Sequence, residues 1–216
     1  MKMSTSKRGA FISFEGIDGC GKSTQVKMLL EKLNKEGIDC SLVREPGGTQ
    51  VSEEIRSVLL KNREENMSSR AEALLMTASR AQLTKEKIKP ALDMGVCVIA
   101  DRYKDSTLAY QGGGRGIDID YLLELNNFAT YDLDPDITIL IDISSKEAQN
   151  RTNINNPDRI ENAGLEFQEQ VRNLYLQLAD RFPLRFLKID GRESIEVIHS
   201  TIWEKTINCI NAKKKM

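Results

Sequence analysis

Short apolar runs alternate with longer amphipathic segments along the 216-residue chain. The apolar runs are too short for helices, and several are rich in β-branched residues, as buried parallel strands are. We expect five strands, at Ala10–Glu15, Cys40–Arg44, Val96–Asp101, Ile137–Ile143 and Arg185–Ile189. The amphipathic pattern predicts helices at Lys22–Glu36, Ser52–Lys61, Ala71–Met94, Ile119–Ala129, Ser145–Arg151, Leu165–Ala179 and Ser194–Ile210. This alternation predicts an α/β fold in which helices cover both faces of a five-stranded parallel sheet, with ligands at the carboxyl ends of the strands.

One polar segment, Asn150–Gly164, interrupts the alternation. It is rich in asparagine, contains Pro157 and separates two helical patterns. A surface loop and a mobile lid are both compatible with it, and composition alone favours the loop. We expect one domain over residues 1–216, with a candidate lid at about 150–164.

The charge balance narrows the range of partners. Lysine and arginine total 31 residues and aspartate and glutamate 32, so the net charge of -1 gives no global basic field for nucleic acid or an anionic membrane. The four cysteines have no CxxC spacing, which argues against a zinc site or a disulfide framework and favours a reducing compartment. No apolar run approaches the roughly 20 residues of a membrane span. We expect a cytoplasmic protein that binds neither nucleic acid nor membrane.

The strongest motif follows the first expected strand. Residues 16–23 read Gly-Ile-Asp-Gly-Cys-Gly-Lys-Ser and fit the P-loop pattern G-x-x-x-x-G-K-[ST] between a strand and a helix. The glycines of such a loop let backbone N–H groups surround phosphate oxygens, and the helix N-terminus adds its positive end. Lys22 would bridge the β- and γ-phosphates, and the Ser23 hydroxyl would bind Mg²⁺. The triphosphate-binding residues that we expect are Gly16, Ile17, Asp18, Gly19, Cys20, Gly21, Lys22, Ser23 and Thr24.

A P-loop establishes a nucleoside triphosphate site but does not establish a reaction. A GTPase switch would need an N-K-x-D motif, and here Asn34-Lys35 is followed by Glu36-Gly37. An ATP-driven motor or a binding module would usually be larger or carry a partner surface, which nothing in the sequence marks. A kinase and a P-loop nucleotide sensor without activity both remain open at this point.

A carboxylate and an arginine end the third expected strand, in Asp101-Arg102-Tyr103. An acidic residue at a strand end beside a P-loop is suited to hold Mg²⁺ directly or through water. Arg102 is then placed to bind a second anion, because a planar guanidinium grips phosphate oxygens with two N–H groups. The alternative is an ordinary ion pair at the strand end. Asp18, inside the P-loop, would repel phosphate unless it faces a sugar hydroxyl or an acceptor, or bonds its own turn.

These motifs and several others resemble the blocks of bacterial-type thymidylate kinases over about Phe11–Ile210. The matching blocks are FEGIDGCGKST, REPGGT, the helix with SRAQL, ADRYKDSTLAYQGGGRG, DRIE and IDGRESIEVI. REPGGT together with DRY and AYQGGGRG is highly specific to that family. The resemblance implies a P-loop kinase fold, a homodimer, Mg²⁺ with ATP as the phosphoryl donor, and dTMP as the acceptor.

The resemblance also implies roles near the acceptor phosphate and sugar. Arg102 and Arg56 correspond to arginines that bind the dTMP phosphate. Asp18 and Glu45 correspond to carboxylates near the sugar and that phosphate. Tyr110 corresponds to a ring near C2′, where a bulky group disfavours a ribose hydroxyl.

Other positions correspond to the thymine pocket of the family. Arg80 matches an arginine that donates to thymine O4, and Thr107 and Gln111 match polar residues near the base. Met76 stands where many members have a phenylalanine that stacks on thymine, and a thioether packs on a ring face but is less rigid. A nucleotide or nucleoside kinase with broader base choice is therefore the nearest rival. The dTMP-binding residues that we expect are Asp18, Glu45, Pro46, Arg56, Met76, Arg80, Arg102, Ser106, Thr107, Tyr110 and Gln111.

Positive charge for catalysis is expected from the candidate lid. No arginine lies between Gly16 and Lys22, and the segment 150–164 contains only Arg151 and Arg159. Arg159, in the DRIE block, is our choice for the contact with the transferring group, and Arg151 for a contact with adenine or the phosphates. The acceptor is already anionic, so no general base is needed. The catalytic residues that we expect are Lys22, Arg102, Arg159 and Asp18.

Overall fold

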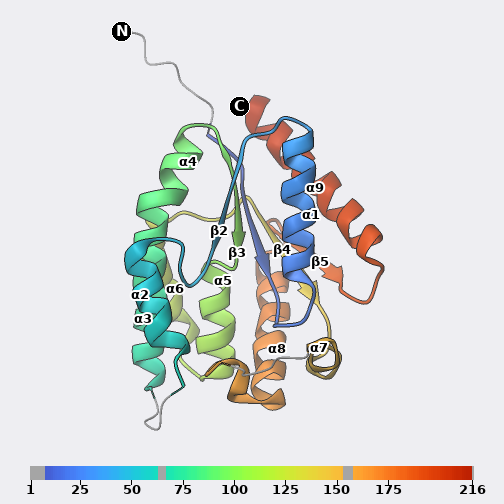
Figure 1. The fold of residues 1–216 in the computed structure, drawn as a ribbon. Helices are drawn as coiled ribbons and strands as arrows, with labels where there is room; N and C mark the ends of the chain where they lie inside the picture. Colours follow the sequence, from blue (N-terminus) through green and yellow to red (C-terminus); the bar gives the residue numbers. More distant parts are fainter. Residues whose placement is uncertain (1–7, 63–66, 153–157, 216) are drawn as a thin grey trace.

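The computed structural model describes residues 8–62, 67–152 and 158–215 of the chain (Figure 1). Its centre is a five-stranded, all-parallel sheet with the strand order β2-β3-β1-β4-β5. The strands are β1 (Phe11–Glu15), β2 (Cys40–Arg44), β3 (Cys97–Asp101), β4 (Ile137–Asp142) and β5 (Phe186–Asp190). All five predicted strands are confirmed, and their bounds differ from the prediction by at most one residue.

The helices that connect the strands follow the predicted pattern for most of the chain. They are α1 (Lys22–Lys35), α2 (Gln50–Leu60), α3 (Ser69–Leu83), α4 (Lys89–Asp93), α5 (Lys104–Thr107), α6 (Ile119–Thr130), α7 (Ser145–Arg151), α8 (Leu165–Arg181) and α9 (Ile195–Lys215), with a short 3-10 helix η3 (Glu161–Ala163). The structure differs from the prediction in two places, one between α3 and α4 and one after β3.

The predicted helix Ala71–Met94 is interrupted by a π-helical turn, η1 (Thr84–Ile88). In this turn the Lys89 N–H donates to the Thr84 carbonyl, one residue farther than in an α-helix. Pro90 follows directly and has no N–H to donate to the preceding turn, so it breaks the α-helical ladder at this point.

The segment after β3, for which no element was predicted, is helical. It begins as α5 and continues as a π-helical turn, η2 (Leu108–Gly114), that ends in three glycines. The glycines allow η2 to pack closely on α8, because a Cβ at Gly114 would lie 2.3 Å from the Phe167 ring and one at Gly113 would lie 2.8 Å from the Gln170 carbonyl oxygen. This tertiary packing, which overrides the low helix propensity of glycine, could not be predicted from the local sequence.

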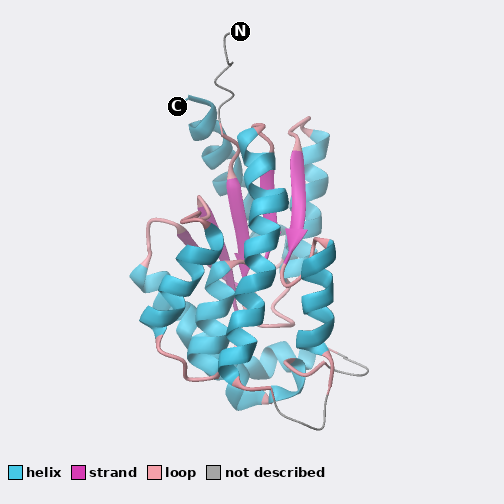
Figure 2. Cartoon of the chain, turned by 90° about the vertical axis from the view of Figure 1, so that its left-hand side faces the viewer, coloured by secondary structure: helices cyan, strands magenta, loops and turns pink. Residues whose placement is uncertain are grey.

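Helices cover both faces of the sheet (Figure 2). Successive side chains of a strand point to opposite faces, so the partners of two neighbours in β1 identify what covers each face. Ile12 lies in a core cluster with Leu29 of α1, whereas Phe11 lies in another cluster with Leu83 of α3. All five residues of β1 are buried. The loop that follows β1 is therefore attached to a rigid strand at the centre of the sheet. Within the described residues, no helix combines the length and apolar composition that crossing a bilayer requires.

Candidate active site

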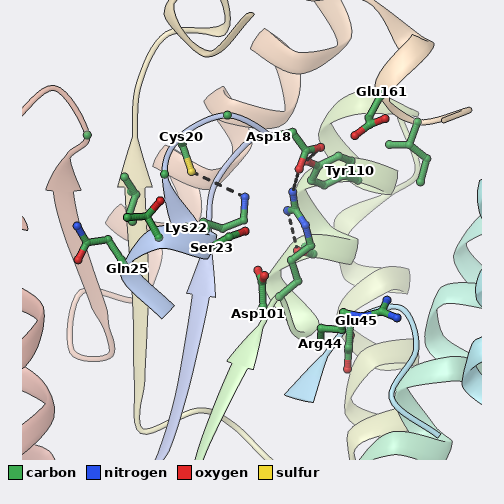
Figure 3. Close-up of a pocket in the computed structure, with 18 of the residues that line it drawn as sticks. Asp18, Cys20, Lys22, Ser23, Gln25, Arg44, Glu45, Asp101, Tyr110 and Glu161 are labelled. Carbon is green, nitrogen blue, oxygen red and sulfur yellow. Dashed lines mark hydrogen bonds and ion pairs between the residues drawn. The ribbon is translucent and has the colours of Figure 1, made fainter. Parts of the chain in front are cut away.

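A cavity of about 750 Å³ lies where the segments after all five strands meet. The segment after β1 supplies one wall and the segments after β2 and β3 supply another. Figure 3 shows Lys22 and Ser23 on one side and Arg44 and Glu45 on the other. Most of the predicted site residues line this one cavity: Asp18, Gly19, Cys20, Gly21, Lys22, Ser23, Thr24, Glu45, Pro46, Arg56, Met76, Arg80, Asp101, Arg102, Ser106, Thr107, Tyr110, Gln111 and Arg151. Gly16, Ile17 and Arg159 are not part of the lining.

The P-loop has the backbone that its sequence predicts. Gly16, Gly19 and Gly21 have φ values of 136°, 84° and 101°, which other residues adopt only with strain. Lys22 is 6% exposed, and its ammonium group donates to the carbonyl oxygens of Gly16 at 2.9 Å and Ile17 at 3.0 Å. The first two residues of the loop thus position the lysine through their carbonyl groups rather than by lining the cavity.

Arg102 joins the P-loop to the segment after β3. Its guanidinium donates to the Asp18 carboxylate at 2.6 Å and to the Gly16 carbonyl at 3.0 Å, and it lies 4.9 Å from the centre of the Tyr110 ring. Burial alone would raise the pKa of Asp18, but the charges of Arg102 and Lys22 lower it to about 2. Asp18 is therefore ionised at neutral pH, and its partner is Arg102 rather than its own turn. Arg102 therefore forms its ion pair with Asp18 rather than with Asp101, the acidic residue that precedes it in the sequence.

Arg80 is one of the largest fully buried side chains of the described residues, and it is held on all sides. It contacts Glu45 at 2.7 Å through Nε and at 2.6 Å through Nη2, and the Tyr103 carbonyl at 3.0 Å. Its Nη1 donates to Thr107 and Asn126, each at 2.7 Å. Five contacts equal the five N–H groups of a guanidinium. A donation from Arg80 to thymine O4, which the resemblance implies, would require one of these contacts to be exchanged.

Glu45 keeps an acceptor beside the cavity. Burial raises the pKa of its carboxyl group, and the charge and hydrogen bond of Arg80 act against this rise. Its Oε1 atom is buried and has no hydrogen-bond partner among the described residues, although a buried polar atom normally has one. Pro46, which follows, accepts from Arg56 at 2.8 Å through its carbonyl group. Arg44 donates to the same oxygen at 3.1 Å and also lines the cavity, a position that sequence reasoning missed.

Glu72 of α3 is a second buried carboxylate that sequence reasoning missed. It is 1% exposed and accepts from Gln111 at 2.8 Å, from Arg115 at 3.2 Å and from Arg159 at 2.6 Å. The Gln111 amide nitrogen faces Glu72, so the hydrogen bond leaves the amide oxygen of Gln111 as an acceptor. Glu72 therefore connects a cavity wall to the candidate lid.

The two lid arginines lie in different surroundings. Arg151 lines the cavity and donates to the Gly191 carbonyl at 2.9 Å, in the segment after β5. Arg159 pairs with Glu72 and donates to the Leu59 carbonyl at 2.9 Å, which keeps it out of the lining. Residues 153–157 of the candidate lid lie outside the described residues. The catalytic role of Arg159 and the bounds of the lid stay predictions.

Ser23 and Asp101 both line the cavity, as a shared metal site requires. Among the described residues, no group of three or more histidine, cysteine or acidic side chains could form a protein-only cage. This arrangement fits Mg²⁺, which uses one or two protein oxygens and completes its coordination with water and phosphate oxygens.

A parallel sheet with a P-loop after β1, a carboxylate at the end of β3 and several arginines around one cavity defines a P-loop nucleotide kinase. The family model described as thymidylate kinase matches residues 14–202. The chain is 49% identical to the thymidylate kinase of Caldanaerobacter subterraneus subsp. tengcongensis, over 90% of this chain and 93% of that protein. It is 44% identical to the thymidylate kinase of Enterococcus faecalis, over 93% of this chain and 96% of that protein. The chain belongs to the thymidylate kinase family, and it is an enzyme of the nucleotide kinase class.

Proposed function

We propose that the chain transfers the γ-phosphoryl group of ATP to dTMP, which yields dTDP, the precursor of dTTP, and ADP. The observation that carries this proposal is the position of Arg102. It projects from the segment after β3, contacts Gly16 and Asp18 of the P-loop, and lines the cavity. A cation there can bind the phosphate of the acceptor and offset its repulsion from the triphosphate.

The donor half would hold ATP through the P-loop. Backbone N–H groups and Lys22 would surround the phosphates, and Ser23 and Asp101 would hold Mg²⁺, which neutralises phosphate charge when it is bound. Adenine would lie toward Arg151 and the start of α9. In support of this, Gln25 of α1 donates to the Ile195 carbonyl at 2.9 Å and so ties the P-loop helix to that end of the cavity.

The acceptor half would hold dTMP through charge at one end and shape at the other. Arg102 and Arg56 would bind its phosphate, and the Tyr110 ring would exclude a ribose hydroxyl. At the base, the free oxygens of Glu45 and Gln111 are acceptors suited to the N3–H group of thymine. Cytosine has an acceptor at that position, so both oxygens would disfavour it.

Phosphoryl transfer between two phosphates needs position and charge rather than a general base. Lys22 and Arg102 are in the cavity to supply that charge. Arg159 would add to it, and for this it must exchange its contact with Glu72 for one with the transferring group. Exclusion of water from the cavity would limit hydrolysis of ATP.

We propose a homodimer formed through α2, α3 and α6. Val51 and Val58 of α2, and Tyr121 and Phe128 of α6, are each seven residues apart and so lie on one face of their helix. The exposed fractions of these four residues range from 41% to 84%, and Leu74 of α3 is 58% exposed. Apolar faces of this kind are typical of an interface. A sedimentation measurement should give about twice the chain mass at micromolar concentration, a common range for specific assemblies; a monomer at high concentration would exclude the dimer.

The nearest alternative is a kinase with broader base choice, which Met76 favours because a thioether is less rigid than an aromatic ring. A panel of dTMP, dUMP, dCMP and thymidine with Mg²⁺ and ATP separates these functions. We expect the highest kcat/KM for dTMP. Comparable values for dCMP would support the broader kinase, and no transfer to any of the four would support a P-loop sensor. The proposal includes a cytoplasmic location and no binding to nucleic acid.

A further inference from the structure

Glu15, the last residue of β1, lies outside the cavity lining and is fully buried. It accepts three hydrogen bonds, two from the segment after β3 and one from α8. The donors are the Tyr103 N–H at 2.8 Å, the Ser106 hydroxyl at 2.6 Å and the Tyr175 hydroxyl at 2.7 Å. Tyr175 comes from α8 and also lies outside the cavity lining.

Both hydroxyl groups donate to the same oxygen of Glu15. When Glu15 is ionised, above its pKa of about 7, it has no proton of its own, so the two hydroxyl groups must donate and turn their lone pairs elsewhere. Those lone pairs face Arg102, whose Nη1 atom lies 3.4 Å from both Ser106 Oγ and Tyr175 Oη. The same nitrogen donates to the Gly16 carbonyl at 3.0 Å. Arg102 is therefore surrounded on its buried side by oxygen acceptors, and Glu15 orients the two hydroxyl groups among them.

Glu15 also supports the backbone at Arg102. Arg102 has a φ of 71°, in the left-handed region that a non-glycine residue occupies only when its surroundings hold it there. Its own N–H donates to the Phe14 carbonyl at 3.0 Å, and the next N–H, that of Tyr103, donates to Glu15. The end of β1 thus holds both sides of the turn from which the Arg102 side chain projects.

The burial of Glu15 is electrostatically unfavourable. Burial raises the pKa of its carboxyl to about 7, and the Asp105 charge adds to this rise, while Ser106, Arg102 and Tyr175 lower it. Asp105 is itself paired with Arg185 at 2.6 Å. A buried carboxylate carries a desolvation cost that lowers the stability of the fold. An apolar residue of similar size would avoid that cost, so packing alone does not explain a glutamate at position 15.

We propose that Glu15 and Tyr175 are positioning residues for Arg102, which hold its guanidinium toward the acceptor phosphate without contacting either substrate. Ser106 completes the set, since its hydroxyl lies 2.6 Å from the Glu15 carboxyl and 2.9 Å from the Tyr175 hydroxyl. The proposal rests on the proposed function, because it assigns Arg102 to the phosphate of dTMP. It adds that the acceptor site depends on a side chain of α8.

The test is Tyr175→Phe, with Tyr103→Phe as the matched control. Both changes remove one buried hydroxyl group, but the Tyr103 hydroxyl contacts Thr84, away from Arg102. Tyr175→Phe should raise the KM for dTMP about tenfold, the effect of one lost hydrogen bond near a charge, and leave the KM for ATP within about twofold. Tyr103→Phe should leave the KM for dTMP unchanged. Equal changes in both KM values for Tyr175→Phe would overturn the proposal.

A double-mutant cycle with Arg102→Ala tests whether Tyr175 acts through Arg102. Tyr175→Phe should have no further effect on the dTMP KM when Arg102 is absent, because coupled residues are not additive. A tenfold effect in both backgrounds would overturn the positioning role.

Glu15→Gln should affect the dTMP KM at least as strongly as Tyr175→Phe does, since a carboxamide cannot accept from all three donors. If the wild-type protein does not phosphorylate dTMP, the proposed function fails; if it does and Tyr175→Phe behaves like wild type, only the present inference fails.

Discussion

The donor half and the acceptor half of the cavity are assembled in different ways. The donor half is local, since Lys22 donates to the Gly16 carbonyl only six residues away. The acceptor half joins distant segments, since Arg80 and Glu45 are 35 residues apart and Arg159 and Glu72 are 87 residues apart. A local loop is formed by its own backbone, whereas a site built from distant segments depends on the buried ion pairs that fix them. Substitutions in the two halves should therefore have different consequences.

The largest effect is expected for Arg159→Ala. A transition-state arginine is commonly worth about 10³–10⁵ in rate, so kcat should fall by a factor in this range with little change in the Kd of either substrate. Single-turnover kinetics would measure this. Arg151→Ala is the matched control and should instead raise the KM for ATP. If Arg151→Ala loses phosphoryl transfer and Arg159→Ala keeps it, the roles of the two arginines are reversed. Normal phosphoryl transfer by both variants would show that neither lid arginine acts in the transition state.

Lys22→Ala should have the next largest effect. Lys22 belongs to the local donor half, and within the described part of the chain its ammonium donates to atoms of the P-loop alone. The fold should therefore remain intact while transfer falls by about 10²-fold or more, as for loss of a group that stabilises developing charge. Steady-state rates and circular dichroism on the same sample would check both parts. Turnover near the wild-type rate in a folded variant would contradict the donor site.

Glu72→Ala should lower the free energy of unfolding, unlike the two preceding substitutions, which should act on phosphoryl transfer. It leaves the buried amide of Gln111 and the partly buried guanidinium groups of Arg115 and Arg159 without their partner, and one unsatisfied buried group costs about 1–3 kcal/mol. Urea denaturation should show a loss of roughly 2–4 kcal/mol. The control is Asp190→Ala, which removes an exposed ion pair with Arg192 and should leave the free energy of unfolding nearly unchanged. Equal losses of unfolding free energy in the two variants would show that the contacts of Glu72 stabilise the fold no more than a surface ion pair does.

The smallest effect concerns the pH dependence of stability. Because the pKa of Glu15 is raised to about 7, the folded protein keeps a proton that the unfolded chain has lost above its ordinary pKa of 4.5. Stability from this group therefore falls as the pH rises from about 4.5 to 7, by at most about 1.4 kcal/mol per pH unit. Asp18, with a pKa lowered to about 2, titrates below this window. Denaturation across the window should show a steeper fall in wild type than in Glu15→Gln, because Glu45, whose pKa burial also raises, contributes equally in both; identical slopes would contradict the account.

The sequence allowed the fold and the donor half to be predicted because both depend on short-range patterns. Strand and helix periodicity identified all five strands, and the P-loop pattern identified the loop whose glycines adopt positive φ. The surroundings of Arg80 could not be predicted, because its partners Glu45, Thr107 and Asn126 come from three separate segments. Tyr175 lies in an ordinary amphipathic helix, and no local motif marks it. The helix after β3 was missed because its glycines favour a turn until α8 packs against them.

Calorimetric titration of Arg102→Ala with dTMP and with a non-hydrolysable ATP analogue tests the central claim most directly. The claim is that one cavity contains two separable half-sites and that Arg102 serves the acceptor. Loss of one charge-assisted contact of roughly 1.5–3 kcal/mol should raise the Kd for dTMP by about 10- to 150-fold and leave the Kd for the ATP analogue nearly unchanged. Lys22→Ala should show the opposite preference. Equal losses for both ligands in Arg102→Ala would contradict a dedicated acceptor arginine and the division of the cavity into two half-sites.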